Sequence, residues 1–202
     1  MIYKIGLTGG PCAGKSSALA AISSAMAEDG IMVVAAPEAA TQIINEGMMP
    51  GTAEFQLAVF KRQLELERVA NIKAASIDNN GQDVVVVYDR TSADQLAYVS
   101  YEMFANFIDL VGLTIDQIIY RYTVVIHMVS AAVDTNAYTT ANNNARGETR
   151  EQAVAMEEKT LRGNKKVFGS NLVVVDNSTG FDEKIQAVVA HIRATIAKKR
   201  AT

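Results

Sequence analysis

Glycines crowd a lysine and two serines near the start of the chain, where residues 9–17 read GGPCAGKSS. The spacing is Gly, any four residues, Gly, Lys, Ser, and the segment follows a short apolar run and precedes a helical pattern. Such a loop wraps backbone N–H groups around a phosphate because glycines allow the tight turns, and the helix directs its positive end toward the anion. A turn that only caps a helix would need neither the lysine nor the serine, so the segment predicts a nucleotide-binding P-loop.

The residues of this loop have different predicted parts. Lys15 would reach the β- and γ-phosphate oxygens, and the hydroxyl of Ser16 would bind Mg²⁺. Cys12 could be reactive because it stands near a helix N-terminus, but a small residue at a variable loop position is the simpler interpretation. The predicted nucleotide contacts are Gly9, Gly10, Pro11, Cys12, Ala13, Gly14, Lys15, Ser16 and Ser17.

A second acidic residue should hold the magnesium ion through water, and Asp89 at the end of the apolar run VVVVYD is the candidate. A strand-end turn residue or helix cap is the alternative, but the P-loop independently requires an acid at this position. Arg90 follows directly, and the segment 89–94 reads DRTSAD. Because ligands bind outside the carboxyl ends of parallel strands, we expect this segment to lie beside the P-loop and to suit phosphoryl transfer.

Glu38 follows the second apolar run, in the sequence VVAAPEAA. A carboxylate there could remove a proton from an attacking hydroxyl. It could equally be an acidic residue in the first turn of a helix that begins after Pro37. Position alone leaves both interpretations open.

Two arginines, Arg146 and Arg150, stand four residues apart in the polar segment 138–150, YTTANNNARGETR. If a helix begins here, both project from one face and could neutralise the oxygens of a transferring phosphoryl group. A solvated arginine pair, compensated by neighbouring glutamates, is the alternative. We predict a mobile loop for this segment and a lid over about 138–165.

The elements that must position these residues follow from the alternation of short β-rich runs with longer helical patterns. This alternation predicts an α/β fold in which helices cover both faces of a parallel sheet. Two apolar stripes at helical spacing and a long charged segment over 55–75 predict helices packed on that sheet. The predicted strands are 3–8, 31–35, 84–88, 123–129 and 172–175, and the stripes are Leu96, Val99, Met103, Phe107, Leu110 and Ile185, Val189, Ile192, Ile196.

Composition narrows the class of protein. A length of 202 residues suits one domain, which we predict to span 1–202. With 49% apolar and 20% charged residues and no long apolar run, the chain should be globular, and the single cysteine and the absence of an export signal favour the cytoplasm. The net charge of −3 gives no general attraction to nucleic acid or to an anionic membrane.

The type of P-loop protein is narrowed by what the sequence lacks. A guanine-reading switch should carry Asn-Lys-x-Asp after a strand, whereas GNKKV at 163–167 fails at Val167 and follows a helical pattern. Motors and helicases carry further arginine and sensor elements that are not found. A compact kinase with a Mg²⁺-bound nucleotide, a lid and an acceptor cleft remains.

Several segments, taken in order, resemble the small AAA-like P-loop ATPase/kinase family. They are GGPCAGKSS, PEAAT, FQLAVFKRQLELE, YDRTSADQLAY, ARGETREQA and VVVDNSTGFDEKI. The family includes nicotinamide riboside kinase domains, phage kinases that act on nucleotides or on hydroxymethylated DNA bases, and animal relatives that bind GTP and phosphoinositides. The combination is specific for the family and not for a substrate.

The resemblance implies a three-layer P-loop fold with the strand order 2-3-1-4-5. The site residues that it implies are Glu38, Asp89 and Arg90 around the acceptor hydroxyl, Arg146 and Arg150 in a lid, and Asn177, Ser178 and Thr179 near the nucleotide base. The animal lipid-binding relatives carry a further domain, whereas this chain ends soon after HIRATIAKKR, which disfavours a lipid partner. A phage source would place the protein in the host cytoplasm.

The leading prediction is an ATP-dependent kinase that uses Mg²⁺ to pass a γ-phosphoryl group to a hydroxyl of a nucleoside- or nucleotide-like acceptor, either free or as a hydroxymethylated base in phage DNA. Glu38 or Asp89 would take the proton and Arg90 would hold the acceptor, so catalysis would be mostly positioning and electrostatics. GTP is also compatible as the donor.

A nucleotide-binding regulatory switch with a phosphoinositide or protein partner is the alternative. The basic end of the chain, Lys198 to Arg200, would support it, although that end is more simply a helix-end charge cluster. The sequence predicts neither the acceptor nor the oligomeric state.

Overall fold

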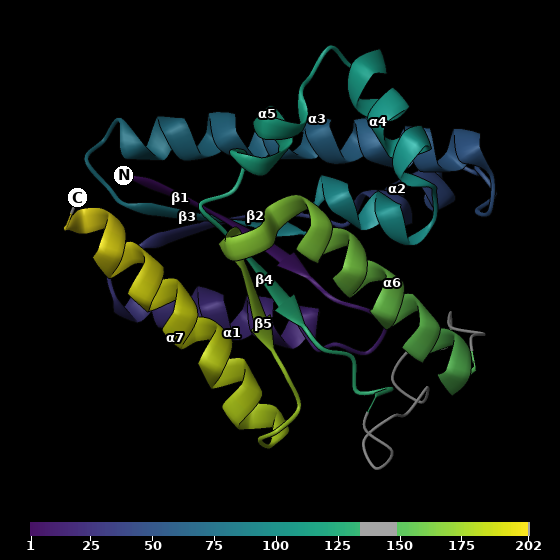
Figure 1. Cartoon of the computed structure of the whole chain (residues 1–202). Helices are drawn as coiled ribbons and strands as arrows, with labels where there is room; N and C mark the ends of the chain where they lie inside the picture. The colour runs from purple at the N-terminus through teal and green to yellow at the C-terminus, as the bar shows by residue number, and fades with distance from the viewer. Residues whose placement is uncertain (134–148, 202) are drawn as a thin grey trace.

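The computed structural model describes residues 1–133 and 149–201. Five strands form one all-parallel sheet in the order β2-β3-β1-β4-β5, which confirms the predicted order 2-3-1-4-5 (Figure 1). The strands are β1 (Ile2–Thr8), β2 (Met32–Ala36), β3 (Val84–Asp89), β4 (Val124–Met128) and β5 (Leu172–Val175).

The central strands have the composition that burial on both faces requires. All of 84–88 in β3 and all of β4 are buried, and both strands are almost entirely apolar. In the register of the sheet, Leu7 of β1 lies opposite Asp89 of β3, and Thr8 of β1 lies opposite His127 of β4. The loop that leaves β1 therefore emerges between Asp89 and His127, and this placement organises the site described below.

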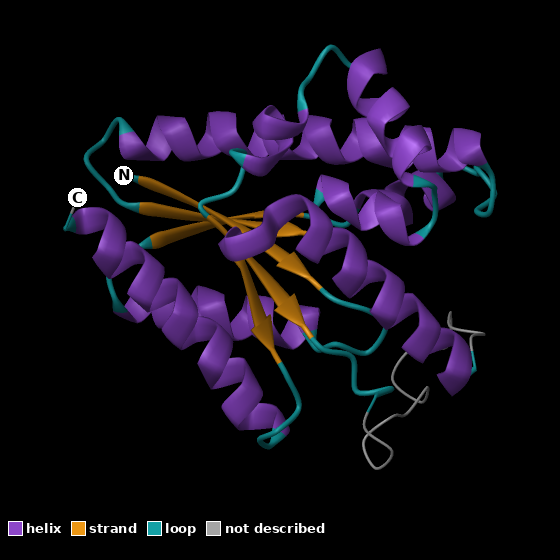
Figure 2. Ribbon diagram, viewed as in Figure 1, coloured by secondary structure: helices purple, strands orange, loops and turns teal. Residues whose placement is uncertain are grey.

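Helices cover both faces of the sheet and complete three layers (Figure 2). On one face, α1 (Lys15–Glu28) and α7 (Phe181–Arg200) pack together against the strands. On the other face lie α2 (Ala39–Asn45), α3 (Ala53–Asp78), α4 (Tyr101–Leu110), α5 (Ile115–Ile119) and α6 (Arg150–Phe168). Two short 3-10 helices, η1 (Ser92–Ala97) and η2 (Gly169–Asn171), complete the elements of the described residues.

The predicted apolar stripes have different outcomes. Ile185, Val189, Ile192 and Ile196 are all buried in α7, which confirms that stripe. The stripe from Leu96 to Leu110 is wrong as a single helix, because Leu96 lies in η1, Val99 lies between the two elements and the other three residues lie in α4, where Leu110 is 66% exposed. The physical reason is the hydroxyl of Ser100, which accepts a hydrogen bond from the backbone N–H of Met103 and so caps a new helix.

The predicted helix over 55–75 is confirmed and is longer than expected, because α3 begins after Thr52. The Thr52 hydroxyl accepts a hydrogen bond from the backbone N–H of Phe55 and so caps the helix. Phe60 is fully buried and packs edge-on against Phe104 of α4, so α3 is fixed to the sheet and to α4. No helix within the described ranges is long and apolar enough to cross a membrane.

Candidate functional site

The P-loop follows β1 and leads into α1, as predicted. Gly9 has φ 145 and Gly14 has φ 91, conformations that residues with a Cβ rarely adopt. A Cβ on Gly9 would also overlap the carbonyl oxygen of Met128 in β4, so both the backbone and the neighbouring strand require glycine here. Gly14 is the N-cap of α1 and has no side chain to satisfy the first N–H groups of the helix, which leaves them available to an anion.

Lys15 begins α1 and lies beside the ends of β2 and β3. Burial lowers its pKa to about 8, and the positive charge of Arg90 acts in the same direction, against the opposing effects of Asp89 and Glu38. The nearby carboxylates of the protein thus compensate the positive charge of the ammonium group only in part. Phosphate oxygens in the loop would supply the missing negative charge.

Arg90 joins three elements of the site. Its Nε donates to Oε1 of Glu38 at 3.0 Å, and its Nη1 donates to the carbonyl oxygen of Gly9 at 2.8 Å. Its backbone has φ 80, an unfavourable conformation for a residue with a side chain. The structure thus brings together the P-loop, the end of β3 and Glu38, as the sequence predicted.

Glu38 directly precedes α2 as its N-cap residue, so the alternative of an acidic residue within the first turn is wrong, because the helix begins at Ala39. Its carboxylate makes no capping bond and instead accepts from Arg90 and from the hydroxyl of Thr41 at 2.9 Å. Burial opposes ionisation, but Arg90 and Lys15 together hold the pKa of Glu38 below its ordinary value. Glu38 is therefore a stable carboxylate that faces the phosphate loop.

Asp89 ends β3 and has one buried carboxyl oxygen, Oδ1, without a hydrogen-bond partner in the described part of the chain. Burial and the nearby charge of Glu38 raise its pKa, and Lys15 opposes the shift. The same conditions would favour a bound cation.

A magnesium ion would fit these residues through oxygen atoms. Asp89 would hold it through water, and the exposed Ser16 at the first turn of α1 would contribute its hydroxyl. Among residues 1–133 and 149–201, no group of three His, Cys, Asp or Glu residues could hold a metal by itself. The ion would therefore depend on nucleotide phosphate oxygens for further ligands.

A buried hydrogen-bonded cluster that the sequence did not reveal lies beneath Arg90 and centres on Asp94. The carboxylate of Asp94 accepts from the hydroxyls of Thr8 (2.8 Å) and Thr91 (2.9 Å) and from Nδ2 of Asn164 (2.8 Å). Nη1 of Arg90 lies 3.6 Å from its Oδ2. Asn164 belongs to α6, in the very segment that the sequence excluded as a guanine-reading motif, so it has a structural part instead.

A second unpredicted contact ties α6 to the P-loop. The backbone N–H of Gly10 donates to Oε2 of Glu157 at 2.7 Å, and Oε1 of Glu157 lies 2.6 Å from Nε2 of the fully buried His127. Burial opposes ionisation of Glu157, but His127 and the Gly10 N–H keep its pKa below the ordinary value. A Cβ on Gly10 would lie 2.6 Å from the Glu157 carboxylate, which explains the second glycine of the loop.

Lys184 of α7 supports the P-loop from the other side. Its Nζ donates to the carbonyl oxygens of Ala13 (3.1 Å) and Val129 and to Oδ1 of Asn177 (2.9 Å). Burial lowers its pKa to about 8. Charged residues of an amphipathic helix are expected at the surface, so periodicity could not identify this buried lysine.

The turn between β5 and α7, for which nucleotide-base contacts were predicted, lies close to the loop. Asn177 donates to the carbonyl oxygen of Ser130 at 2.9 Å, and the N–H of Ser178 donates to Asp176 at 3.0 Å. Phe181 begins α7, is 55% exposed, and its ring would lie 2.9 Å from a Cβ placed on Gly14. This exposed ring beside the P-loop is a candidate contact that the sequence did not indicate.

The predicted lid is described only in part. Arg146 and the rest of the range 134–148 lie outside the described residues, and 150–165 belong to α6. Thr149 and Gln152 form a capping box at the start of that helix. Nε of Arg150 donates to the carbonyl oxygen of Ala132 at 2.9 Å, so Arg150 lies at the end of the chain segment that follows β4.

Comparison with protein-family models matches residues 4–184 to a family described as an AAA domain. The matched range begins in β1 and ends in α7, so it contains the P-loop, both strand ends and the supporting residues of α6. A comparison with curated proteins found no match.

Proposed function

The chain belongs to the AAA domain family of P-loop proteins, and from that premise we propose that it is an ATP-dependent kinase. It transfers the γ-phosphoryl group, with Mg²⁺, to a hydroxyl of a nucleoside- or nucleotide-like acceptor. The observation that carries the proposal is the Arg90–Glu38 pair, which lies at 3.0 Å beside the P-loop. A carboxylate that can take a proton and a cation that can orient a hydroxyl, both beside the P-loop, suit a bound hydroxyl acceptor.

The donor half of the site consists of the loop and its support. The backbone from Gly9 to Gly14 surrounds the phosphates, Lys15 compensates the β- and γ-oxygens, and Ser16 with Asp89 holds Mg²⁺. When bound there, Mg²⁺ would neutralise charge on the transferring group. The turn with Asn177 and Ser178, and the exposed ring of Phe181, face the nucleotide base.

The acceptor half divides the work between the two carboxylates. Because the pKa of Glu38 is held low, its side chain is ionised at neutral pH and can accept the proton of the attacking hydroxyl. Asp89, with its raised pKa and unpartnered oxygen, is reserved for the metal. Arg90 holds the acceptor and fixes Glu38. Arg150, together with Arg146, closes over the phosphoryl group by exchanging its present carbonyl partner for phosphate oxygens.

The AAA assignment confirms the broader part of the resemblance in the sequence. The narrower part, to nicotinamide riboside kinase domains and to phage kinases of nucleotides and DNA bases, supports the choice of a nucleoside-like acceptor. The regulatory-switch alternative receives less support, because Arg200 of the basic end donates to Asp83 at 2.7 Å and so already pairs within the chain.

The test is a phosphate-transfer panel. The protein is incubated with γ-labelled ATP or GTP and with nucleosides, nicotinamide riboside, oligonucleotides with and without hydroxymethylated pyrimidines, or phosphoinositide vesicles. We expect label in one class of nucleoside-like acceptor, and none with the Lys15→Ala variant. Nucleotide or vesicle binding without label in any acceptor would overturn the kinase proposal and favour the switch.

A further inference from the structure

A basic pocket lies away from the P-loop. It has a volume of about 360 Å³ and is lined by Lys4, Arg68, Asn71, Ile72, Ala75 and Arg121. Lys4 stands near the start of β1 and Arg121 shortly precedes β4, whereas the P-loop follows the carboxyl end of β1. The pocket therefore belongs to the opposite end of the sheet and has no residue in common with the candidate site.

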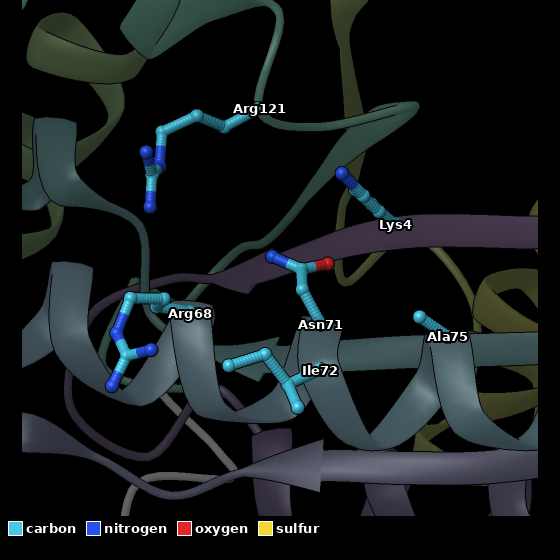
Figure 3. Close-up of a pocket in the computed structure, with 6 residues that line it drawn as sticks. All are labelled: Lys4, Arg68, Asn71, Ile72, Ala75 and Arg121. Carbon is cyan, nitrogen blue, oxygen red and sulfur yellow. The ribbon is translucent and has the colours of Figure 1, made fainter.

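Three positive side chains surround this pocket. In Figure 3, Lys4 and Arg121 extend above α3 from separate segments, and Arg68 lies on α3 itself, with Asn71 between them. Since no carboxylate lines the pocket, the groups that face the space are two guanidinium groups, one ammonium group, one amide and the apolar side chains of two α3 residues. This is the composition of a site for an anion.

The partners of the three cations leave donors for a ligand. Lys4 has no side-chain hydrogen bond or ion pair with another described residue. Arg121 donates through Nε to the buried Glu67 at 2.6 Å, which fixes its orientation and leaves its two terminal nitrogens. Arg68 pairs with Glu65 at 2.8 Å, but both side chains are more than half exposed, so that pair can readily be exchanged for a ligand.

Asn71 supplies an oriented neutral donor. Its Oδ1 accepts the hydroxyl of Tyr88 at 2.8 Å, so the amide oxygen is engaged from the side of the sheet. Its NH₂ group remains available to donate from the middle of the pocket floor, where Figure 3 places the side chain. Planar guanidinium groups and an amide match the several oxygen atoms of a phosphate.

We propose that this pocket binds a small phosphate-bearing anion. Its size suits a molecule with one or two phosphate groups and a small organic part against Ile72 and Ala75. A nucleic acid would require an extended basic face along its backbone, and the acidic net charge of −3 does not favour one. The ligand is therefore a small molecule, and its phosphate group is the part that the pocket recognises.

The test measures binding of labelled pyrophosphate in the Lys15→Ala chain, in which the P-loop is weakened. Equilibrium dialysis at low ionic strength should give one saturable site per chain. Lys4→Gln and Arg68→Gln, added singly, should each weaken this binding about tenfold, the effect of one lost charge-assisted hydrogen bond. The double variant should lose the site.

Lys73→Gln is the matched control, because it removes the same charge from an exposed position of α3 that does not line the pocket. It should change the dissociation constant less than about twofold, the limit expected when only screened long-range charge is lost. Thermal unfolding of each variant checks that it is folded.

The proposal would be overturned by no saturable pyrophosphate binding in the Lys15→Ala chain, by equal affinity in the Lys4→Gln/Arg68→Gln double variant, or by equal weakening by Lys73→Gln. A short oligonucleotide that displaces pyrophosphate and binds with several chains per strand would also overturn it, because the site would then recognise a polymer. None of these measurements depends on phosphate transfer, so failure of the kinase proposal would leave them interpretable.

Discussion

The P-loop region and the Asp94 cluster beneath it both contain carboxylates and cations, but the charges in the two regions are compensated differently. In the P-loop region, the pKa of Lys15 falls to about 8 and a buried oxygen of Asp89 has no partner in the described part of the chain. In the cluster beneath it, the carboxylate of Asp94 accepts from three side chains and lies beside a fourth, Arg90. Buried polar groups are normally satisfied, so the unpartnered carboxyl oxygen of Asp89 marks the P-loop side as prepared for a ligand.

Replacement of Lys15 gives the sharpest separation of the two regions. Lys15→Ala should reduce phosphate transfer by at least about a thousandfold, because one preorganised charge on the transferring group is lost. The fold should remain, since no ion pair of the described residues involves this ammonium group and burial disfavours it. Turnover and thermal unfolding of the same preparation measure both effects. Retained phosphate transfer would refute the P-loop assignment. Loss of folding would refute the view that Lys15 serves the ligand and not the stability of the fold.

Replacement of Asp94 should instead act mainly on the stability of the fold. Asp94→Ala removes a buried carboxylate that accepts from Thr8, Thr91 and Asn164, and it leaves the Thr8 hydroxyl without an acceptor, at a cost of about 3 kcal/mol in the free energy of unfolding. Urea denaturation measures that loss. Asp89→Asn is the control, because Oδ1 of that carboxyl already has no partner in the described part of the chain, so the change should affect stability far less. Equal destabilisation by the two changes would contradict the contrast between the regions.

Glu38→Gln tests whether Glu38 is the general base while Asp89 serves the metal. It should lower kcat by about a hundredfold, the typical contribution of a general base. Titration of Glu38 should begin to lower the wild-type kcat only at a more acidic pH than for an ordinary glutamate, because Arg90 and Lys15 hold its folded-state pKa below the ordinary value against the opposing effect of burial. Steady-state kinetics between pH 5 and 9 measure both expectations. A kcat for Glu38→Gln near that of the wild type would transfer the role of base to another group.

The sequence predicted the fold and the residues that lie beside the P-loop, because both follow from local patterns. Strand composition, the glycine spacing and the rule that parallel strands present their carboxyl ends together were enough to bring Glu38, Asp89 and Arg90 to the P-loop. The cluster around Asp94 joins residues that are up to 156 positions apart, Thr8 and Asn164 among them. A helical pattern gives no sign that one polar residue is buried, so Asn164 was read only as part of an incomplete motif.

The same limit applies to the two side chains that hold the loop from behind. Glu157 and Lys184 lie 147 and 171 positions from the loop residues they bind, and each stands in a charged helical pattern typical of a solvated face. Their burial arises from packing of α6 and α7 at the sheet edge, which no local pattern encodes. The prediction of one continuous helix from Leu96 to Leu110 was wrong for a different reason. The cap at Ser100 starts a new helix and outweighs the apolar periodicity.

Lys184→Met tests whether a supporting residue can be told from a ligand-binding one. Methionine keeps the length of the side chain but leaves the carbonyl oxygens of Ala13 and Val129 without a donor, so unfolding should become easier by about 1 to 3 kcal/mol. KM for the nucleotide should rise more than kcat falls, since the loop is less well held and the reacting groups are intact. A loss confined to kcat would mean that Lys184 acts on the transferring group itself.

The smallest expected effect is the pH dependence of stability that Asp89 contributes. Because its folded-state pKa is raised, the native state binds this proton more tightly than the unfolded chain does, and its contribution falls as the pH rises through the folded-state pKa. Asp89→Asn removes that slope, so the variant should lose less stability than the wild type between acidic and neutral pH. Urea denaturation at pH 4.5 and pH 7 measures the difference. Mg²⁺ with a nucleotide should remove the same dependence of stability on pH from the wild type, because a cation satisfies the carboxylate. Without ligand, an identical dependence in the wild type and in Asp89→Asn would show that this carboxyl carries no uncompensated charge.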